Sequence, residues 1–261
     1  TKKKEKFIML SNDKVVSKEL YTQGDFDLEK FYKVLNLLKS NYSINNIYDI
    51  GANIGTVCIP AVKRGLVKKA IAIEPESENY KLLKLNISLN NLDDDIKAYN
   101  YALSFEDDKI LDLEISNDNS GDHRIRLSNT KTGIHGEERR TTTKVKGKTF
   151  DKMFSNISSK NDLVWIDTQG FEANILMGAE KLILSGAPIV IEFWPYGLKL
   201  NNSLNKLKDL LKKFKFYYDL SDSSEYKNEI TTKSIENLSS GWAEEKPNKH
   251  NLFTDLLLLS K

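Results

Sequence analysis

Two stretches of this 261-residue chain combine glycines, amides and carboxylates in an order that suits nucleoside binding. The first, residues 49–55, reads Asp-Ile-Gly-Ala-Asn-Ile-Gly, and the second ends at Glu74-Pro75. A strand, a glycine turn, a helix and a second strand that ends in a carboxylate are how an α/β sheet holds an adenosine. Binding of an adenosine-containing ligand is therefore the first chemistry that the sequence predicts.

The glycine turn differs from a dinucleotide-binding loop. A G-x-G-x-x-G pattern that starts at Gly51 needs glycines at positions 53 and 56, where this chain has Asn53 and Thr56. The second glycine of that pattern lets a pyrophosphate approach the backbone, so its absence points to an adenosine ligand without that group. S-adenosylmethionine fits this description, and an NAD-dependent oxidoreductase is kept as an alternative.

Ligands of open α/β sheets lie outside the carboxyl ends of the strands, and several polar residues fall at such predicted ends. Gly51 and Gly55 allow a tight turn, and we expect Asn53 to cap the following helix or to touch the ligand. The Glu74 carboxylate can accept hydrogen bonds from both ribose hydroxyls. The predicted cofactor contacts are Asp49, Gly51, Ala52, Asn53, Gly55, Glu74, Pro75, Tyr101, Ala102 and Asp167.

Several blocks, taken in order along the chain, resemble the FkbM-type methyltransferases. These blocks are residues 49–55, Glu74-Pro75 with Asn79, Leu83 and Asn86, residues 101–104, and residues 165–172 with 176–179. The resemblance covers roughly residues 45–195. It implies a class I, S-adenosylmethionine-dependent methyltransferase that usually acts on a hydroxyl, so we expect O-methylation of a small molecule, a sugar or a glycan.

One position departs from that family's usual pattern. Many members resemble Asp-x-Glu-Gly where this chain has Asp167-Thr168-Gln169-Gly170. A glutamine cannot serve as a base, so we interpret Gln169 as a positioning group in the catalytic site. The same glutamine motivates a second alternative, a non-catalytic module that binds S-adenosylmethionine.

Methyl transfer to oxygen requires an aligned acceptor and a group that removes its proton. Asp167 is one candidate base, and His123, in the polar run of residues 120–124, is the other because the pKa of a histidine suits this work. A histidine in a glycine-bearing loop is equally a turn or surface residue. For the acceptor we predict contacts with Arg124, Glu192 and Trp194.

The elements that position these residues alternate between strand and helix. We expect strands at 47–50, 69–74, 96–103, 163–167 and 188–193, with amphipathic helices between them. The helix after the glycine turn buries Ile54 to Val62 and should be kinked by Pro60. Two closing strands without a helix between them, 214–220 and 253–259, favour an antiparallel end to the sheet. The predicted fold is a Rossmann-like α/β class I methyltransferase sheet, mostly parallel, with an antiparallel C-terminal strand and helices on both faces.

Two segments fall outside this alternation. Residues 1–45 are expected to form a helical lead-in, with a helix at 27–38, packed on a methyltransferase domain of residues 46–261. From about residue 105 to 149 short alternating runs with glycines predict a β-rich insertion over the sheet. Residues 122–148 hold eight Lys or Arg against three Asp or Glu, which suits an anionic acceptor or a solvated surface.

Composition excludes several other classes of protein. The formal net charge is +2, so no global field calls for nucleic acid or an anionic membrane, and no apolar run is long enough to span one. Residues 167–170 also lack the Asn/Asp-Pro-Pro-Tyr/Phe pattern of nucleic-acid amino-methyltransferases. The single cysteine, Cys58, fits the cytoplasm and a place in the core. No Cys/His cluster indicates zinc, and we predict no metal, with magnesium at Asp167 as the alternative.

Overall fold

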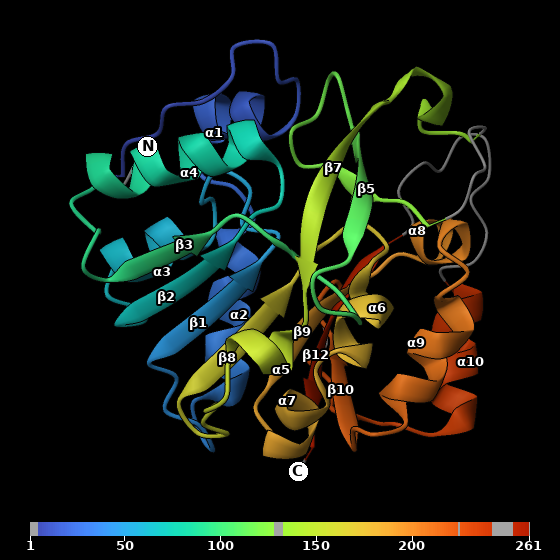
Figure 1. The fold of residues 1–261 in the computed structure, drawn as a ribbon. Coiled ribbons are helices and arrows are strands. Elements are labelled where there is room, and N and C mark those ends of the chain that lie inside the picture. The colour runs from blue at the N-terminus through green and yellow to red at the C-terminus, as the bar shows by residue number, and fades with distance from the viewer. Residues whose placement is uncertain (1–4, 128–132, 224, 242–252, 261) are drawn as a thin grey trace.

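The computed structural model describes residues 5–127, 133–223, 225–241 and 253–260. The strands of the main sheet lie side by side in the ribbon of Figure 1. Within the described ranges this sheet has eight strands, and buried apolar side chains dominate its central members. Alternate residues of each strand point to opposite faces, so a strand that is apolar at every position needs cover on both sides. In spatial order the strands are β11 (Asn228–Glu229), β10 (Phe216–Asp219), β12 (Thr254–Leu259), β9 (Ile189–Phe193), β8 (Asp162–Ile166), β1 (Asn46–Ile50), β2 (Lys69–Ile73) and β3 (Ile96–Tyr99).

The direction of the strands confirms the predicted fold class. Strands β3, β2, β1, β8 and β9 are joined by parallel pairs, whereas β12 is antiparallel to both β9 and β10. The register aligns Ile50 with both Ile73 and Ile166, so the residues that follow these strands meet at one edge. Because β12 runs the other way, its first residues lie beside the last residues of β9.

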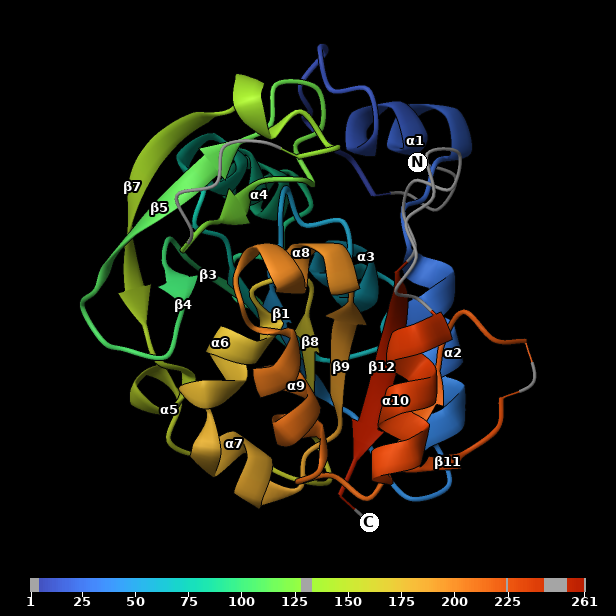
Figure 2. The same ribbon diagram turned by 90° about the vertical axis from the view of Figure 1, so that its right-hand side faces the viewer.

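Helices cover both faces of the sheet, as expected (Figure 2). One face packs Ile47, Ala72 and Trp165 against helices α2 (Leu28–Leu38), α3 (Cys58–Lys63) and α4 (Ser77–Leu89). The other face packs Ile50, Ile166 and their neighbours. Its helices are α5 (Phe150–Met153), α6 (Glu172–Met177), α7 (Glu180–Ser185), α9 (Leu204–Leu211) and α10 (Thr232–Gly241).

A second sheet stands over one end of the first (Figure 1). It contains β4 (Ala102–Leu103), β7 (Thr141–Lys148), β5 (Ile110–Ile115) and β6 (Arg124–Ile125), with a short 3-10 helix at Glu137–Arg139. The expected single strand at 96–103 is wrong: β3 ends at Tyr99, and Ala102 and Leu103 pair with β7 instead. Residues 128–132 of the expected insertion lie outside the described residues.

Several helix boundaries also correct the predictions. Helix α3 begins only at Cys58, so Pro60 lies in its first turn rather than beyond it. Amide groups of the first turn have no partner within the helix, so a proline there removes no helical hydrogen bond. The helix expected after strand 163–167 is divided into α6 and α7 at Gly178. After β9 the chain forms two short helices, α8 (Pro195–Leu200) and α9. Helix α10 separates the two closing strands, against expectation.

The N-terminal segment packs against the rest of the chain through buried polar contacts. It contains α2 and an additional helix, α1 (Val16–Gln23), which we did not predict. The carboxylate of Asp13 accepts a hydrogen bond from the Ser120 amide at 2.8 Å, which ties this segment to the loop before β6. Arg64 holds Glu5, with 2.6 Å between Nε and Oε1. The segment therefore forms one wall over the carboxyl ends of the strands.

Candidate functional site

The glycine turn after β1 brings two strand ends into contact. Gly51 has φ 87°, and a Cβ atom there would lie 1.9 Å from the carbonyl oxygen of Asp167, so only glycine fits. Gly55 also has positive φ, but a Cβ atom there would meet the Ile59 side chain rather than a cavity. The structure therefore gives Gly55 a packing role, whereas Gly51 lies beside the site.

Asn53 links the turn to its surroundings instead of capping α3. Its amide donates to Glu74 Oε2 at 2.9 Å, and its Nδ2 donates to the Ser120 carbonyl at 3.0 Å. The start of α3 is capped by Asp49, whose Oδ2 accepts from the Cys58 amide at 3.1 Å. Burial raises the pKa of Asp49 to about 6. The expected capping role thus belongs to Asp49.

A narrow cavity lies between the main sheet and the insertion. It contains the predicted cofactor residues Gly51, Asn53, Glu74, Pro75, Tyr101, Ala102 and Asp167. His123 lies here too, and its Nδ1 accepts from the Ser116 amide at 3.0 Å. Burial lowers the pKa of His123, which favours the neutral imidazole. Apolar walls come from Ile50, Ile73, Leu103, Leu113, Ile125, Phe171 and Ile175.

The Glu74 carboxyl is buried at the end of β2 inside this narrow cavity. Its Oε1 accepts from the Glu76 amide at 2.8 Å, and its Oε2 accepts from the Asn53 amide. Burial raises the pKa of Glu74 to about 8 despite these two bonds. A carboxyl group here is thus held in a fixed orientation between the turn and α4, where a ribose hydroxyl is expected.

Asn79, in the first turn of α4, is a site residue to which we assigned no role from the sequence. Its Nδ2 donates to the Ser120 carbonyl at 2.9 Å, while its Oδ1 is buried without a hydrogen-bond partner. The residue lines the narrow cavity beside Glu74. An orphaned buried acceptor is costly unless a ligand donates to it, so this atom fits a nucleoside N–H or O–H. The sequence signal that could have identified Asn79 as a site residue was its position about one helical turn after Glu74-Pro75.

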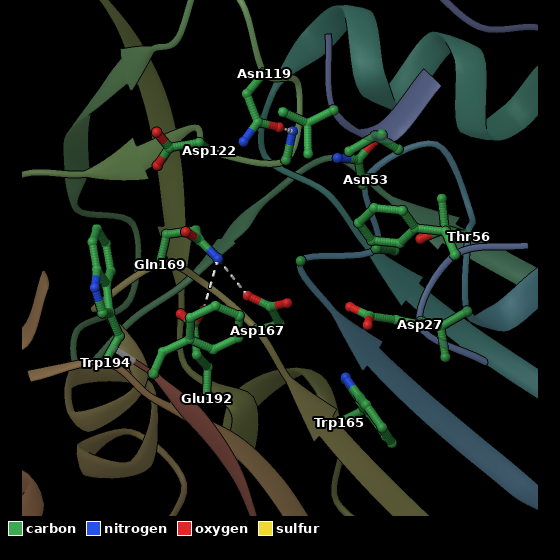
Figure 3. Close-up of a pocket in the computed structure, with 18 of the residues that line it drawn as sticks. Asp27, Asn53, Thr56, Asn119, Asp122, Trp165, Asp167, Gln169, Glu192 and Trp194 are labelled. Atoms are coloured by element: carbon green, nitrogen blue, oxygen red, sulfur yellow. Dashed lines mark hydrogen bonds between the residues drawn. The ribbon is translucent and has the colours of Figure 1, made fainter. Parts of the chain in front are cut away.

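A larger cavity of about 500 Å³ shares Gly51 and Asp167 with the narrow one. Figure 3 shows residues that line this larger cavity. The N-terminal segment supplies Val15, Val16, Glu19, Phe26, Asp27 and Lys30 to its wall. From the predicted residues it collects Asp49, Gly51, Ala52, Asn53, Arg124, Asp167, Gln169, Glu192 and Trp194. Asp167 and Gln169 line both cavities, so they mark the junction between them.

Three side chains form the floor of the larger cavity (Figure 3). Gln169 Nε2 donates to Asp167 Oδ1 at 2.9 Å and to Glu192 Oε1 at 3.1 Å, as the dashed lines in the view show. The backbone of Gln169 is left-handed, with φ 56°. Glu172 holds this strained loop, because its Oε1 accepts from the Thr168 amide at 3.0 Å, the Thr168 hydroxyl at 2.9 Å and the Gly170 amide at 3.2 Å.

The pKa values of the two carboxyl groups on this floor, those of Asp167 and Glu192, are raised. Burial, and then the charge of Asp255, raise the pKa of Asp167 to about 7. Burial, and then the charge of Asp167, raise the pKa of Glu192 well above its usual range. Two buried carboxyls that both contact one amide cannot easily ionise together. The floor can therefore accept or release a proton at physiological pH.

The basic stretch of the insertion is largely neutralised by its own neighbours. Arg124 lines the larger cavity, yet its Nε lies 2.6 Å from Asp122 Oδ1 and its Nη1 lies 2.9 Å from Glu137 Oε1. Lys144, Lys146 and Lys148 are paired with Asp112 or Asp108. The predicted positive patch is thus a set of ion pairs among the described residues, rather than an open anion site.

Among the residues that the structure describes, no group of three or more His, Cys, Asp or Glu side chains is placed to hold a metal ion. Of the helices in the same ranges, none has the length and apolar character that a membrane crossing needs.

The sheet order, the glycine turn and the acidic end of β2 together define a class I α/β methyltransferase. A family model described as "Methyltransferase FkbM domain" matches residues 49–218. The chain belongs to this FkbM methyltransferase family, and its cofactor is S-adenosylmethionine. The apolar walls, Glu74 and the orphaned Asn79 Oδ1 of the narrow cavity fit the adenosine part of that cofactor.

Solved structures of other methyltransferases show limited likeness to this chain. Methyltransferase FkbM from Methylobacillus flagellatus KT has 14% identity and a TM-score of 0.46, and the match covers 82% of this chain and 43% of that one. Precorrin-6y C5,15-methyltransferase from Geobacter metallireducens GS-15 has 12% identity and a TM-score of 0.48, with 99% and 96% covered.

An O-methyltransferase from Thermotoga maritima has 11% identity and a TM-score of 0.43, with 93% of this chain and 70% of that one covered. Because the match covers 43% of the Methylobacillus protein, this chain spans less than half the length of that structure. A search of curated proteins found no match.

Proposed function

We propose that this methyltransferase methylates a hydroxyl oxygen of a small molecule, a sugar or a glycan, with Asp167 as the base. The observation that carries this proposal is that Asp167, whose carboxyl group could take a proton, is among the residues that line both the narrow and the larger cavity. S-adenosylmethionine supplies an electrophilic methyl group. In the narrow cavity Glu74, Asn79, Tyr101 and Ala102 would hold its adenosine, which leaves the larger cavity for the acceptor.

The chain's own residues orient the acceptor and move one proton. As the new O–CH3 bond forms and the S–CH3 bond breaks, the hydroxyl proton passes to the Asp167 carboxylate. Gln169 holds Asp167 through the 2.9 Å hydrogen bond, and Trp194 and Glu192 are proposed to contact the acceptor. Alignment is the larger contribution, and the base adds about 10²- to 10⁴-fold.

His123 is less well placed for proton removal than Asp167. It lines the narrow cavity, on the side of Glu74, and its Nδ1 is already an acceptor for Ser116. The part of the insertion around His123 would therefore face the cofactor rather than the acceptor. A contact of His123 with the adenosine is our proposal for this residue.

The sequence left two alternative functions, an NAD-dependent oxidoreductase and a non-catalytic module that binds S-adenosylmethionine. The family assignment gives no support to an NAD-dependent oxidoreductase. A non-catalytic module that binds S-adenosylmethionine predicts cofactor binding without transfer to any acceptor. Action in the cytoplasm stays a prediction from the single cysteine.

The test of the proposed function separates binding from turnover. Calorimetric titration with S-adenosylmethionine measures binding, and mass spectrometry of hydroxylated acceptors measures transfer. We expect both, with Asp167→Asn losing transfer and keeping binding. Failure to bind S-adenosylmethionine or S-adenosylhomocysteine at millimolar concentration would contradict the proposal, and so would normal turnover in Asp167→Asn.

A further inference from the structure

The charged groups around the larger cavity point to the chemistry of the acceptor. Its described cations are already paired with carboxylates. Lys30 Nζ lies 2.7 Å from Asp255 Oδ2 and 3.2 Å from Asp27 Oδ1, and these two carboxylates raise the pKa of Lys30 despite its burial. An anionic acceptor that approached this ammonium group would also approach both carboxylates.

Arg124 is engaged in the same way on the opposite wall. Its guanidinium contacts Asp122 and Glu137 and also lies 4.7 Å from the centre of the Trp194 ring. Only 2% of the residue is exposed. Carboxylates thus engage both the lysine and the arginine that line the larger cavity, and burial lowers the pKa of His135, the histidine in its lining, which favours the neutral imidazole.

Glu192, by contrast, has an oxygen that accepts no hydrogen bond from the described residues. The residue is 3% exposed and lines the larger cavity, and its Oε2 has no hydrogen-bond partner. The charged groups that act on it are Asp167, Glu172, Asp255 and Lys30, of which three are acids. A buried carboxyl in such surroundings lacks positive charge, and a ligand that brings one would relieve the cost of burial.

Aromatic side chains flank this carboxyl group. Trp165 and Trp194 lie on either side of the Asp167, Gln169 and Glu192 group in Figure 3, and both line the cavity with Phe26 and Phe253. The face of an aromatic ring attracts cations, and its apolar surface also suits the C–H face of a sugar ring. The acidic side chains and the aromatic rings of the larger cavity together favour a ligand with a positive charge over one with a negative charge.

We propose that the acceptor is an amino alcohol, such as an amino sugar or an aminocyclitol, whose protonated amine binds against Glu192 while its hydroxyl faces Asp167. This inference rests on the proposed function, because it takes Asp167 as the base at the junction with the cofactor. It also explains selectivity for oxygen. An amine held as an ammonium ion has no free electron pair, so the neighbouring hydroxyl is the nucleophile.

The proposal carries a proton linkage that a neutral acceptor does not share. Burial and the neighbouring acids raise the pKa of Glu192, which favours the protonated carboxyl group in the free site. An ammonium ion bound at Oε2 favours the ionised carboxylate, and the displaced proton leaves for solvent. Binding of the amine should therefore release protons at pH 7.

The test is calorimetric titration of the full chain, saturated with S-adenosylhomocysteine, with three hexosamines: glucosamine, galactosamine and mannosamine. Their N-acetyl counterparts and glucose 6-phosphate are the comparison probes. At least one free amine should bind tenfold or more tightly than its N-acetyl counterpart, which is about 1.4 kcal/mol. Titrations in buffers of different ionisation enthalpy should show proton release for the amine alone.

A charge-removing variant shows whether Glu192 is responsible. Glu192→Gln keeps the shape and should abolish both the preference for the amine and the proton release, with unchanged affinity for S-adenosylhomocysteine. Glu180→Gln, on the exposed start of α7, is the matched control and should keep the preference.

Three outcomes would overturn the inference. They are equal binding of the amine and its N-acetyl counterpart, tighter binding of glucose 6-phosphate, and failure of every hexosamine to bind the loaded protein. A chain that does not bind S-adenosylhomocysteine at all would instead overturn the proposed function and this inference with it.

Discussion

At the scale of residues, the site depends on carboxyl groups whose protons are controlled by burial. Asp167 and Glu192 share one amide donor, and Glu74 is held by two backbone amides. The sequence predicted these three residues because each follows or ends a strand. It did not predict the orphaned oxygen of Asn79, because hydrogen-bond satisfaction depends on Ser120, a residue of the distant insertion.

The first prediction concerns the base. Asp167→Asn should lower kcat at least 100-fold, because an amide cannot take the hydroxyl proton, while affinity for S-adenosylhomocysteine changes less than about threefold. In the wild type, kcat should rise about tenfold per pH unit and level off near pH 7, where the Asp167 carboxyl with a pKa of about 7 becomes ionised. A flat profile from pH 5 to 9 would remove Asp167 from proton transfer.

The second prediction concerns the cofactor cavity. Asn79→Ala and Glu74→Ala should each weaken binding of S-adenosylmethionine about tenfold or more, because each removes a polar group that faces the adenosine. Lys81→Ala, exposed on the same helix, is the control and should bind normally. Equal affinities for all three variants, measured by calorimetry, would place the adenosine elsewhere.

At the scale of elements, the turn after β1 is the most constrained part of the site. The sequence predicted a tight glycine turn here and a parallel strand before it, because both follow from local patterns. It did not predict where α3 begins, since Asp49 rather than a residue next to the helix caps it. The pairing of Ala102 with Gly147 likewise depends on contacts that no local pattern reveals.

The third prediction compares two glycines with positive φ. Gly51→Ala should lower the free energy of unfolding by about 3 kcal/mol or more, because its Cβ would overlap the Asp167 carbonyl. Gly65→Ala, with φ 70° and nothing within 4 Å of its Cβ, should cost only about 1 kcal/mol. Urea unfolding measures both, and equal losses would show that the contact with Asp167 is unimportant.

At the scale of the whole molecule, three parts meet around the site. The main sheet supplies the strand ends, the insertion closes the narrow cavity, and the N-terminal segment walls the larger one. The parallel direction of the central strands could be predicted from the alternation of strand and helix, and the antiparallel end of the sheet from the closing strands. The contact between Asp13 and Ser120 could not, because the two residues lie far apart in sequence. We propose 1–45 as a lead-in to one methyltransferase domain, 46–261, that carries the insertion.

The fourth prediction concerns stability against pH. In the folded chain the pKa values of Asp49, Asp167 and Glu74 are about 6, 7 and 8, against ordinary values of 3.8, 3.8 and 4.5 for these side chains. The folded state therefore keeps protons that the unfolded state has lost, so stability falls as pH rises through this window. Urea unfolding should give a free energy lower at pH 8.5 than at pH 5 by roughly 2 kcal/mol or more. An equal or higher value at pH 8.5 would contradict these shifts.

The central claim is that Asp167 directs a methyl group onto a hydroxyl oxygen of an acceptor in the larger cavity. The most direct measurement incubates the chain with S-adenosylmethionine carrying a carbon-13 methyl group and a panel of amino alcohols, and identifies the labelled product by NMR. We predict an O-methyl ether that forms with the wild type and is absent with Asp167→Asn. A labelled N-methyl product, or an O-methyl product undiminished in Asp167→Asn, would contradict the account.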